Sequence, residues 1–466
     1  MVRHPVSNAV RVTAVLVLCG GAGSVWAGHP EGDVRAGRET YVRSCAVCHG
    51  AEGAGDGPYA RRFYPRPRDL TSGIYKFRST VSGTAPTDED LHRAIAHGLP
   101  GTNMPDWRIL DEQAKWDIVA YLKTLSPVFG TIPPEPVILA SDPGQARADL
   151  AQGREVYTKL GCASCHGEQG RANGPSASAF MDDWGMPIRP ANLTQGWNYR
   201  GGGAPRDIVM RVLAGIDGSG MPSYTGAAEP EDVWQMAYYV ASLQEPIEWN
   251  PIVRAVRLGG APPAMPDDAR WDGVPAVGVR LRNAVDSDGV WAQPATVNLV
   301  QVQTARTEEE LLVRVVWDDP TEDRDPQAAD RFAMLLRPHG VRGDQVSLQA
   351  WPYRGAPPLD VCAWRASDGR AREIVADRFD AVDASRVSAA PLTAQAAYED
   401  GRWRLVLRRP LVQRGLEHAA VLGEEPFAPL AFAVWDGGNP GARAVSPWLD
   451  VRLEEPASGA AHAATH

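Results

Sequence analysis

Two short motifs in this chain combine two thiols with an imidazole at fixed spacing. They read Cys45-Ala46-Val47-Cys48-His49 and Cys162-Ala163-Ser164-Cys165-His166. On one helical turn, such thiols can add to the vinyl groups of haem while the adjacent imidazole binds the iron. A redox dithiol or half of a zinc site would not require the histidine. Each motif therefore predicts one covalently attached haem c. The predicted attachment residues are Cys45, Cys48, Cys162 and Cys165, and the predicted iron ligands are His49 and His166.

A haem iron that only transfers electrons needs a second protein ligand, usually a methionine thioether. Met104 lies in the sequence Gly-Thr-Asn-Met-Pro, and Met221 lies in Gly-Ser-Gly-Met-Pro. Each methionine follows the histidine of its own motif by 55 residues. Packing alone does not explain equal spacing in two equivalent loops. We therefore predict that Met104 and Met221 are the second axial ligands.

Met186 and His97 are alternative ligands by residue type. Met186 precedes a proline, as the predicted ligands do, but the first half of the chain has no methionine at the corresponding place. His97 comes just before the first methionine loop, and the residue 117 positions later is Ala214. Since the repeat supports neither residue, we interpret His97 as a surface histidine or one near the haem but not on its iron.

The ligands belong to a longer internal repeat. Gly37–Val42 parallels Gly153–Tyr157, and apolar residues recur at helical spacing in Trp116–Tyr121 and Trp234–Tyr239. Each unit is expected to contain a first helix, a haem motif, a long loop, a methionine loop and a last helix.

Both units resemble class I cytochrome c domains, which are all-helical, over about residues 33–127 and 150–245. In that family, arginines near the haem commonly bind its propionates. The resemblance makes Arg66 and Arg189 candidates for this role, because each stands in a matching Arg-Pro segment between the haem motif and the methionine. A surface arginine beside a proline turn is an equally good interpretation.

The pattern changes after two proline-containing connections, Ile132–Pro143 and Glu245–Pro266. Short alternating runs follow, separated by Gly, Pro and Asp, and they predict an antiparallel β-sandwich. The runs are Val277–Arg282, Val297–Thr304, Leu311–Trp317, Phe332–Arg337, Asp360–Arg365, Trp403–Arg408 and Leu430–Trp435. The predicted fold class is multidomain α + β, with two all-α cytochrome c domains, a sandwich at about residues 267–455 and a flexible tail at 456–466.

The third part resembles the haem b-binding gamma subunit of ethylbenzene dehydrogenase. The resemblance rests on Ala433–Asn439, Val445–Leu449 and Arg354–Ala366. Relatives of this type serve as electron-transfer subunits of exported molybdenum enzymes, including dimethylsulfide dehydrogenase, selenate and chlorate reductases and nitrite oxidoreductases.

The resemblance also implies a methionine and a lysine as haem b ligands, at places that Arg354 and Arg443 occupy here. Arginine stays protonated and does not readily bind iron, so we expect that haem b is lost. Met334 and His339 are conceivable substitutes for the missing ligands. Cys362, in a predicted strand, is interpreted as a buried apolar residue.

The amino end has the layout of a secretory signal peptide. A basic start is followed by an apolar run, Val12–Leu18, and by Val25-Trp26-Ala27, which predicts a signal peptide at 1–27 cleaved near Ala27. A lipoprotein signal ending at Cys19 is the alternative, although Leu18 is bulky where a small residue is needed. No later segment is apolar enough to span a membrane, so a periplasmic protein is expected. The net charge of −10 argues against nucleic acid as a partner.

These features predict a dihaem electron-transfer protein with no catalytic residues of its own. Its expected partners are an exported molybdenum/iron–sulfur oxidoreductase and a soluble cytochrome or membrane oxidase. A dihaem peroxidase-like or reductase enzyme is one alternative, and it would need an open or displaceable position on one iron. A ligand- or glycan-binding module with attached electron-transfer domains is another.

Overall fold

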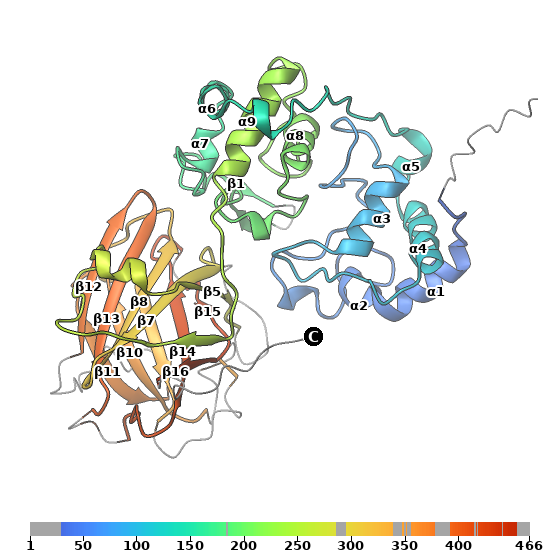
Figure 1. Cartoon of the computed structure of the whole chain (residues 1–466). Helices are drawn as coiled ribbons and strands as arrows, with labels where there is room; N and C mark the ends of the chain where they lie inside the picture. The colour runs from blue at the N-terminus through green and yellow to red at the C-terminus, as the bar shows by residue number, and fades with distance from the viewer. Residues whose placement is uncertain are drawn as a thin grey trace, which may run out of the picture.

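The computed structural model describes residues 29–182, 185–285, 295–338, 347–348, 351, 356–377, 392–413, 416, 418–439 and 441–453. Helices make up the amino-terminal part of the described chain, and a large β-sheet region makes up the carboxyl-terminal part (Figure 1). The predicted signal peptide, the predicted tail, Arg354 and His339 lie outside the described residues.

Two helical units of similar plan follow each other along the chain. The first contains α1 (Val34–Ser44), α2 (Ala46–His49), η1 (Ala60–Arg62), α3 (Asp88–His97), α4 (Glu112–Leu125) and α5 (Val128–Thr131). The second contains η2 (Gln145–Arg147), α6 (Leu150–Lys159), α7 (Ala163–His166), the short strands β1 (Phe180–Met181) and β2 (Pro187–Ile188), η3 (Gly196–Asn198), α8 (Pro205–Ala214) and α9 (Pro230–Ser242). The long loop expected between the haem motif and the methionine therefore contains a helix, which is α3 in the first unit and α8 in the second.

The first and last helices of each unit cross at a glycine. A Cβ atom on Gly37 of α1 would lie 1.9 Å from the carbonyl oxygen of Asp117 in α4. A Cβ atom on Gly153 of α6 would lie 2.3 Å from the carbonyl oxygen of Gln235 in α9. Only a residue without a side chain allows the helices to approach so closely, and this crossing holds the haem motif that follows the first helix.

The β-sheet region contains two sheets. In the first, the strand order is β11-β10-β9-β14-β15-β6, with β16 paired to β14 and β3 paired to β16; in the second it is β12-β13-β8-β7-β4, with β5 paired to β7. The bounds are β3 Ile252–Arg254, β4 Val256–Arg257, β5 Val277–Arg280, β6 Arg282–Asn283, β7 Leu299–Arg306, β8 Glu310–Asp318, β9 Arg331–Leu336, β10 Leu359–Arg365, β11 Ala371–Ala376, β12 Thr393–Glu399, β13 Arg402–Pro410, β14 Phe427–Trp435, β15 Ala444–Val445 and β16 Leu449–Arg452. A short helix, η4 (Ala269–Gly273), precedes β5. Each of the seven predicted runs overlaps one or more of these strands.

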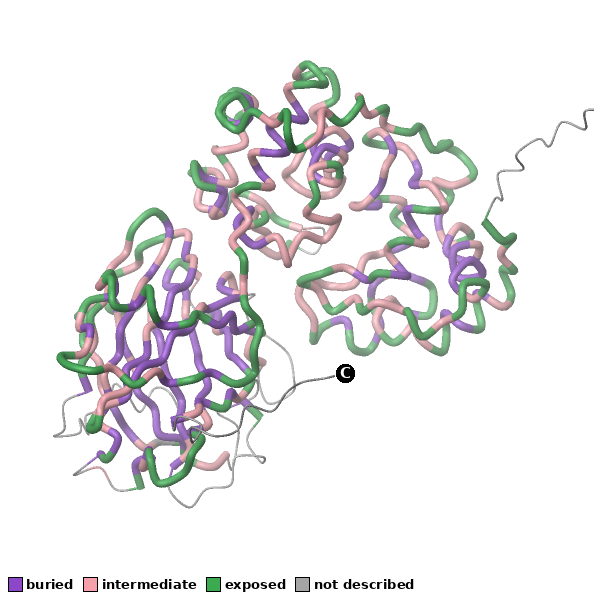
Figure 2. Tube along the Cα trace, viewed as in Figure 1, coloured by how far each residue is buried: buried purple, intermediate pink, exposed green. Residues whose placement is uncertain are grey.

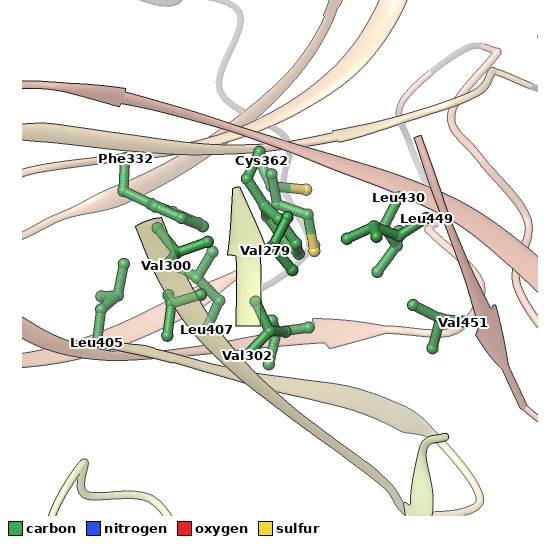
Figure 3. Packing of buried hydrophobic residues seen from close by; sticks show 14 of the residues in the cluster. Val279, Val300, Val302, Phe332, Cys362, Leu405, Leu407, Leu430, Leu449 and Val451 are labelled. Carbon is green, nitrogen blue, oxygen red and sulfur yellow. The ribbon is translucent and has the colours of Figure 1, made fainter. Parts of the chain in front are cut away.

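One apolar cluster joins the two sheets. Val300 and Leu405 come from the second sheet, whereas Phe332, Cys362 and Leu430 come from the first, and all belong to this cluster of buried residues (Figure 3). Buried residues run along the central strands, while exposed residues gather at the turns (Figure 2).

The two proline-containing connections pack against their neighbours. In the first, the amide of Val137 donates to the carbonyl of Ser79 at 2.9 Å, and the Trp234 indole donates to the carbonyl of Ala140 at 3.1 Å. In the second, β3 pairs with β16 and β4 pairs with β7, so this connection joins both sheets. Among the described helices, none combines the length and the apolar character that crossing a membrane requires.

Candidate haem sites

The two motif histidines have the same hydrogen-bonding partner type. Nδ1 of His49, at the end of α2, lies 3.0 Å from the carbonyl oxygen of Arg68. Nδ1 of His166, at the end of α7, lies 2.8 Å from the carbonyl oxygen of Ala191. Since a carbonyl oxygen only accepts, each Nδ1 carries the proton and each Nε2 keeps its lone pair. Burial lowers the pKa of both imidazoles, which favours this neutral form.

None of the four motif cysteines takes part in a disulfide bond. Burial raises the pKa of Cys45 and of Cys162 to about 11. The four sulfur atoms are thus available for bonds to the haem vinyl groups. Within each motif the histidine amide donates to the first cysteine's carbonyl at 2.9 Å, so the residues share one helical turn.

A buried tyrosine fixes each motif to the helix before it. The hydroxyl of Tyr41 in α1 donates to the carbonyl of Gly50 at 2.8 Å. The hydroxyl of Tyr157 in α6 donates to the carbonyl of Gly167 at 2.7 Å. Each contacted glycine directly follows the motif histidine, so helix and motif form one rigid piece.

The two methionine loops close in the same way. The amide of Leu99 donates to the carbonyl of Met104 at 3.1 Å, and the Met104 amide donates to the Thr102 hydroxyl at 3.1 Å. In the second loop, the amide of Ile216 donates to the carbonyl of Met221 at 3.0 Å, and the Met221 amide donates to the Ser219 hydroxyl at 3.3 Å. The equal spacing in the sequence thus corresponds to equal local geometry.

In the second unit, the predicted ligands line one cavity of about 310 Å³. Cofactor-sized pockets in proteins span about 300–1,000 Å³. The lining includes Cys162, Cys165, His166 and Met221, together with apolar residues such as Leu193, Ile208, Val212, Met236 and Val240. The cavity and its donor set, an imidazole and a thioether, fit a haem. Met186 does not line this cavity, whereas Lys76 and Phe77 of the first unit do.

A smaller cavity of about 70 Å³ lies where the two units meet. Five basic side chains line it: Arg66, Arg68 and Lys76 from the first unit, and Arg189 and Arg200 from the second. The two arginines that we predicted as propionate ligands are thus brought to one place. Arg200 is partly exposed, and its partial burial lowers its pKa. One acidic residue, Asp182, lines the cavity with the five cations, so an excess of positive charge remains that an anion would balance. Sequence reasoning missed the other three because only folding gathers them.

The remaining candidate residues are in or near the β-sheet region. Arg443 is partly buried, and its Nη2 donates to the carbonyl of Trp351 at 2.6 Å; burial lowers its pKa to about 10. Met334 of β9 and Cys362 of β10 are paired neighbours in the apolar cluster, and both are fully buried. His97 is exposed at the end of α3. Cys362 is buried in the apolar cluster, as predicted, but its sulfur also lies within 4.8 Å of carboxylate oxygens of Asp360 and Glu373.

Known proteins resemble this chain in part of its length. A family model described as cytochrome c oxidase, cbb3-type, subunit III matches residues 32–122 and 148–240. A Haloferax mediterranei protein provisionally named respiratory nitrate reductase haem subunit ORF7 is 32% identical over 193 residues, which cover 40% of this chain and 67% of that protein. Chlorate reductase subunit gamma of Ideonella dechloratans is 30% identical over 211 residues, covering 43% of this chain and 84% of that protein. Among solved structures, a chain of the reducing HAO-like protein complex of Kuenenia stuttgartiensis is 40% identical, with a TM-score of 0.44, and it covers 47% of this chain and 100% of that one. By its identity with chlorate reductase subunit gamma and its coverage of that protein, the chain belongs to the same family as chlorate reductase subunit gamma.

Proposed function

We propose that this chain is a dihaem cytochrome c that passes single electrons as a subunit or partner of an exported molybdenum oxidoreductase. The proposal rests chiefly on the duplicated ligand arrangement. In both units a histidine Nδ1 donates to a loop carbonyl, and a methionine loop of identical construction follows 55 residues later. The relatives named as nitrate and chlorate reductase subunits support the choice of partner.

In this proposal, Cys45, Cys48, Cys162 and Cys165 hold the haems covalently. His49 with Met104, and His166 with Met221, bind the irons. A haem bound in this way accepts and releases one electron, and a thioether ligand raises its reduction potential. The carbonyls of Arg68 and Ala191 orient the two imidazoles and increase their basicity. Because both axial positions are filled by protein, substrates are kept from the iron, which argues against the peroxidase-like alternative.

Electrons would cross between the units through protein contacts. Lys76 and Phe77 of the first unit line the cavity of the second, and both units supply basic side chains to the small cavity at their junction. We propose that haem propionates are bound there by Arg66, Arg189 and Arg200. The described geometry supports this by the gathering of these cations around a common space.

We further propose that residues 33–127 and 150–245 are the two cytochrome domains. The two sheets of residues 267–455 would then form an antiparallel β-sandwich that docks the oxidoreductase. Arg443 uses its Nη2 as a donor to a backbone carbonyl, which supports a sandwich without haem b. The proposed location is the periplasm, with the signal peptide of residues 1–27 removed near Ala27.

A haem count tests the proposal. A pyridine haemochrome spectrum of the purified chain, before and after acid–acetone extraction, should show two haems c per chain that resist extraction. One haem, or an additional extractable haem b, would contradict it. Met104→His and Met221→His should each lower the potential of one haem, because imidazole replaces thioether. Met186→Leu is the matched control and should change neither potential.

The partner is tested by electron exchange. The reduced chain should be oxidised, or the oxidised chain reduced, by a purified molybdenum enzyme of the nitrate or chlorate reductase type at a saturable rate. Rapid turnover of peroxide by the chain alone, with high-spin ferric iron at one haem, would instead favour the enzyme alternative.

A further inference from the structure

Three aspartates that the haem sites do not use lie together inside the β-sheet region. Asp319 directly follows β8, Asp330 directly precedes β9, and Asp436 directly follows β14. One carboxylate oxygen of each lies within 4.8 Å of those of the other two. Strand β8 belongs to the second sheet, whereas β9 and β14 belong to the first. The cluster therefore bridges the two sheets at one end.

Two oxygens of this cluster lack a hydrogen-bond donor in the part of the chain that the structure describes. Asp330 is well satisfied, because it accepts from the amides of Gly437 and Asp323 and from the indole of Trp403 at 2.8–2.9 Å. In contrast, Oδ2 of Asp319 and Oδ1 of Asp436 are buried without a donor among the described residues. Asp319 is 0% exposed and Asp436 is 3% exposed. Leaving such atoms unsatisfied costs about 1–3 kcal/mol each, and more when they are charged, so a missing partner is indicated.

The charge of the cluster is also poorly balanced. The nearest described cation is Arg189, whose Nη2 lies 3.8 Å from Oδ2 of Asp436. The other buried acidic pair, Asp360 and Glu373, contacts Arg409 at 3.0 and 2.9 Å and so has its own counter-ion. Burial, and then the neighbouring carboxylates, raise the pKa of Asp319 well above its ordinary value. Three carboxylates with one arginine at 3.8 Å have an excess of negative charge, which either protons or a cation would neutralise.

More oxygen atoms surround the unsatisfied carboxylate of Asp436. A Cβ atom on Gly438 would lie 2.8 Å from the Thr321 hydroxyl, 3.0 Å from Oδ2 of Asp323 and 3.1 Å from Oδ1 of Asp436. The absence of a side chain at Gly438 lets these three oxygens gather. The donors are all oxygen, with neither sulfur nor imidazole, and calcium prefers six to eight oxygen ligands in a flexible arrangement.

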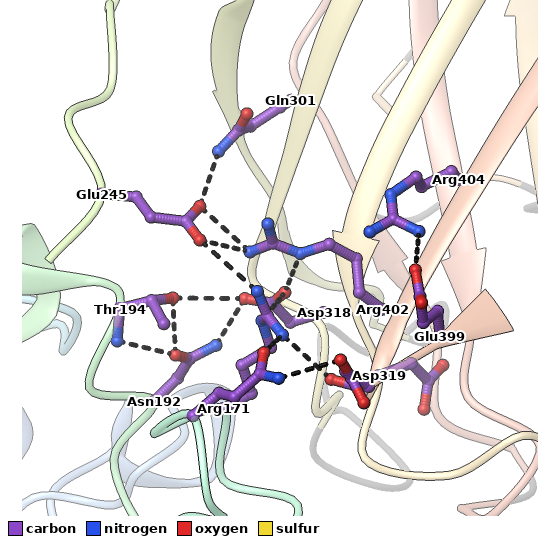
Figure 4. Close-up of polar contacts among 12 residues, drawn as sticks. Arg171, Asn192, Thr194, Glu245, Gln301, Asp318, Asp319, Glu399, Arg402 and Arg404 are labelled. Atoms are coloured by element: carbon purple, nitrogen blue, oxygen red, sulfur yellow. Dashed lines mark hydrogen bonds and ion pairs between the residues drawn. The ribbon is translucent and has the colours of Figure 1, made fainter. Parts of the chain in front are cut away.

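We propose that Asp319, Asp330 and Asp436 bind a calcium ion that ties the two sheets together next to the second helical unit. Asp318, the neighbour of Asp319, accepts from the Asn192 amide at 2.6 Å and from Arg402 at 2.7 Å (Figure 4). Arg402 also binds Glu245 at 2.9 Å. The ion thus fixes the position of Asp319 and of the adjacent Asp318, which contacts the second helical unit through Asn192. It is separate from the haem irons.

Equilibrium dialysis of the full haem-loaded chain tests the site. After treatment with EGTA and dialysis against micromolar calcium, elemental analysis should find one calcium ion per two haem irons. Thermal unfolding should occur at higher temperature with calcium than with EGTA, because an ion that binds only the folded state stabilises it. Terbium should compete for the site, and its emission should be excited through Trp403, whose indole contacts Asp330.

Variants separate the site from non-specific acidity. Asp319→Asn and Asp436→Asn should each weaken calcium binding at least tenfold. Thr321→Val is a milder variant that should weaken calcium binding by a smaller factor, and it replaces either Asn variant that fails to fold. Asp325→Asn, an exposed acid in the same loop, should bind as the unchanged chain does. Less than a tenth of a calcium ion per chain with an unfolding temperature indifferent to calcium would overturn the proposal. The same conclusion follows if both Asn variants keep the ion. The haem count should stay constant throughout, so failure here leaves the proposed electron-transfer function untouched.

Discussion

Arg78 of the first helical unit forms an ion pair with Asp217 of the second, and Nη2 and Oδ2 are 2.7 Å apart. Arg78 is 1% exposed, and its Nη2 also donates to the carbonyl of Ala214 at 3.0 Å. Asp217 accepts from the hydroxyl of Ser82 at 2.7 Å as well. These contacts join the loop before α3 to the end of α8, so they fix the relative position of the two units.

Replacing Arg78 by methionine should therefore loosen the junction of the units. Removing one partner of a fully buried ion pair costs about 3–5 kcal/mol, and the partial exposure of Asp217 reduces this to about 1–3 kcal/mol. The free energy of unfolding in guanidinium chloride measures the effect. Glu39→Gln is the control, because the pair between Glu39 and Arg35 is exposed. Equal stability of the two variants would show that the ion pair does not join the units.

The helix crossings predict a second effect on stability. Gly37→Ala and Gly153→Ala place a methyl group on top of a backbone carbonyl, so each should destabilise the chain by about 1–3 kcal/mol. Both should also weaken the binding of the methionine ligand, because the crossing supports the haem motif. Thermal unfolding and the visible spectrum of the ferric protein check this. Gly130→Ala is the matched control, since a Cβ atom there would meet nothing within 4 Å.

Much of the candidate haem sites could be predicted because their chemistry is local in sequence. The two thiols and the imidazole stand within five residues, and the repeat gave Met104 and Met221 by their equal distance from the histidines. Helix α3 was not predicted, although the sequence carried its start signal. Thr87 and Asp90 form a capping box there.

Other parts could not be predicted because only the fold brings them together. Arg200 and Arg66 line the same cavity where the two units meet, and the internal repeat gives no signal for Arg200. Asp319 and Asp436 stand 117 residues apart, at the ends of strands in different sheets. The short strands β3 and β4 lay within a predicted connection, since two or three residues acquire strand geometry only from the partner strands that they pair with.

Arg200→Gln should lower the potential of the haem whose propionates it is proposed to bind. A partly buried positive charge stabilises the reduced, more negative haem, and its removal should lower the midpoint potential by roughly 30–60 mV, where about 59 mV is a tenfold change for one electron. Redox titration of the full chain measures this. Arg206→Gln, at an exposed arginine of α8, should leave both potentials unchanged. A shift of similar size in both variants would reflect total charge and would count against propionate binding by Arg200.

The buried Asp360 predicts a pH dependence of stability. Burial, and then the neighbouring Glu373, raise the pKa of Asp360 to about 7, from an ordinary value of 3.8. The folded state therefore binds this proton more tightly than the unfolded state does. Its contribution to stability is fully present below about pH 4 and is lost as the pH rises through 7, in total on the order of 2–4 kcal/mol. Denaturant unfolding of the β-sheet region between pH 5 and 8, in EGTA throughout, measures this slope.

Asp360→Asn should flatten the slope, whatever its effect on the absolute stability. Asparagine cannot titrate, but it also leaves Arg409 with Glu373 alone, so absolute stability is a poor measure and the slope is the informative one. Asp450→Asn, at an exposed aspartate of β16, should keep the slope of the unchanged chain. If Asp360→Asn keeps that slope as well, then Arg409, 3.0 Å from Asp360, holds the carboxylate ionised across this range, and the attraction of the arginine outweighs the cost of burial.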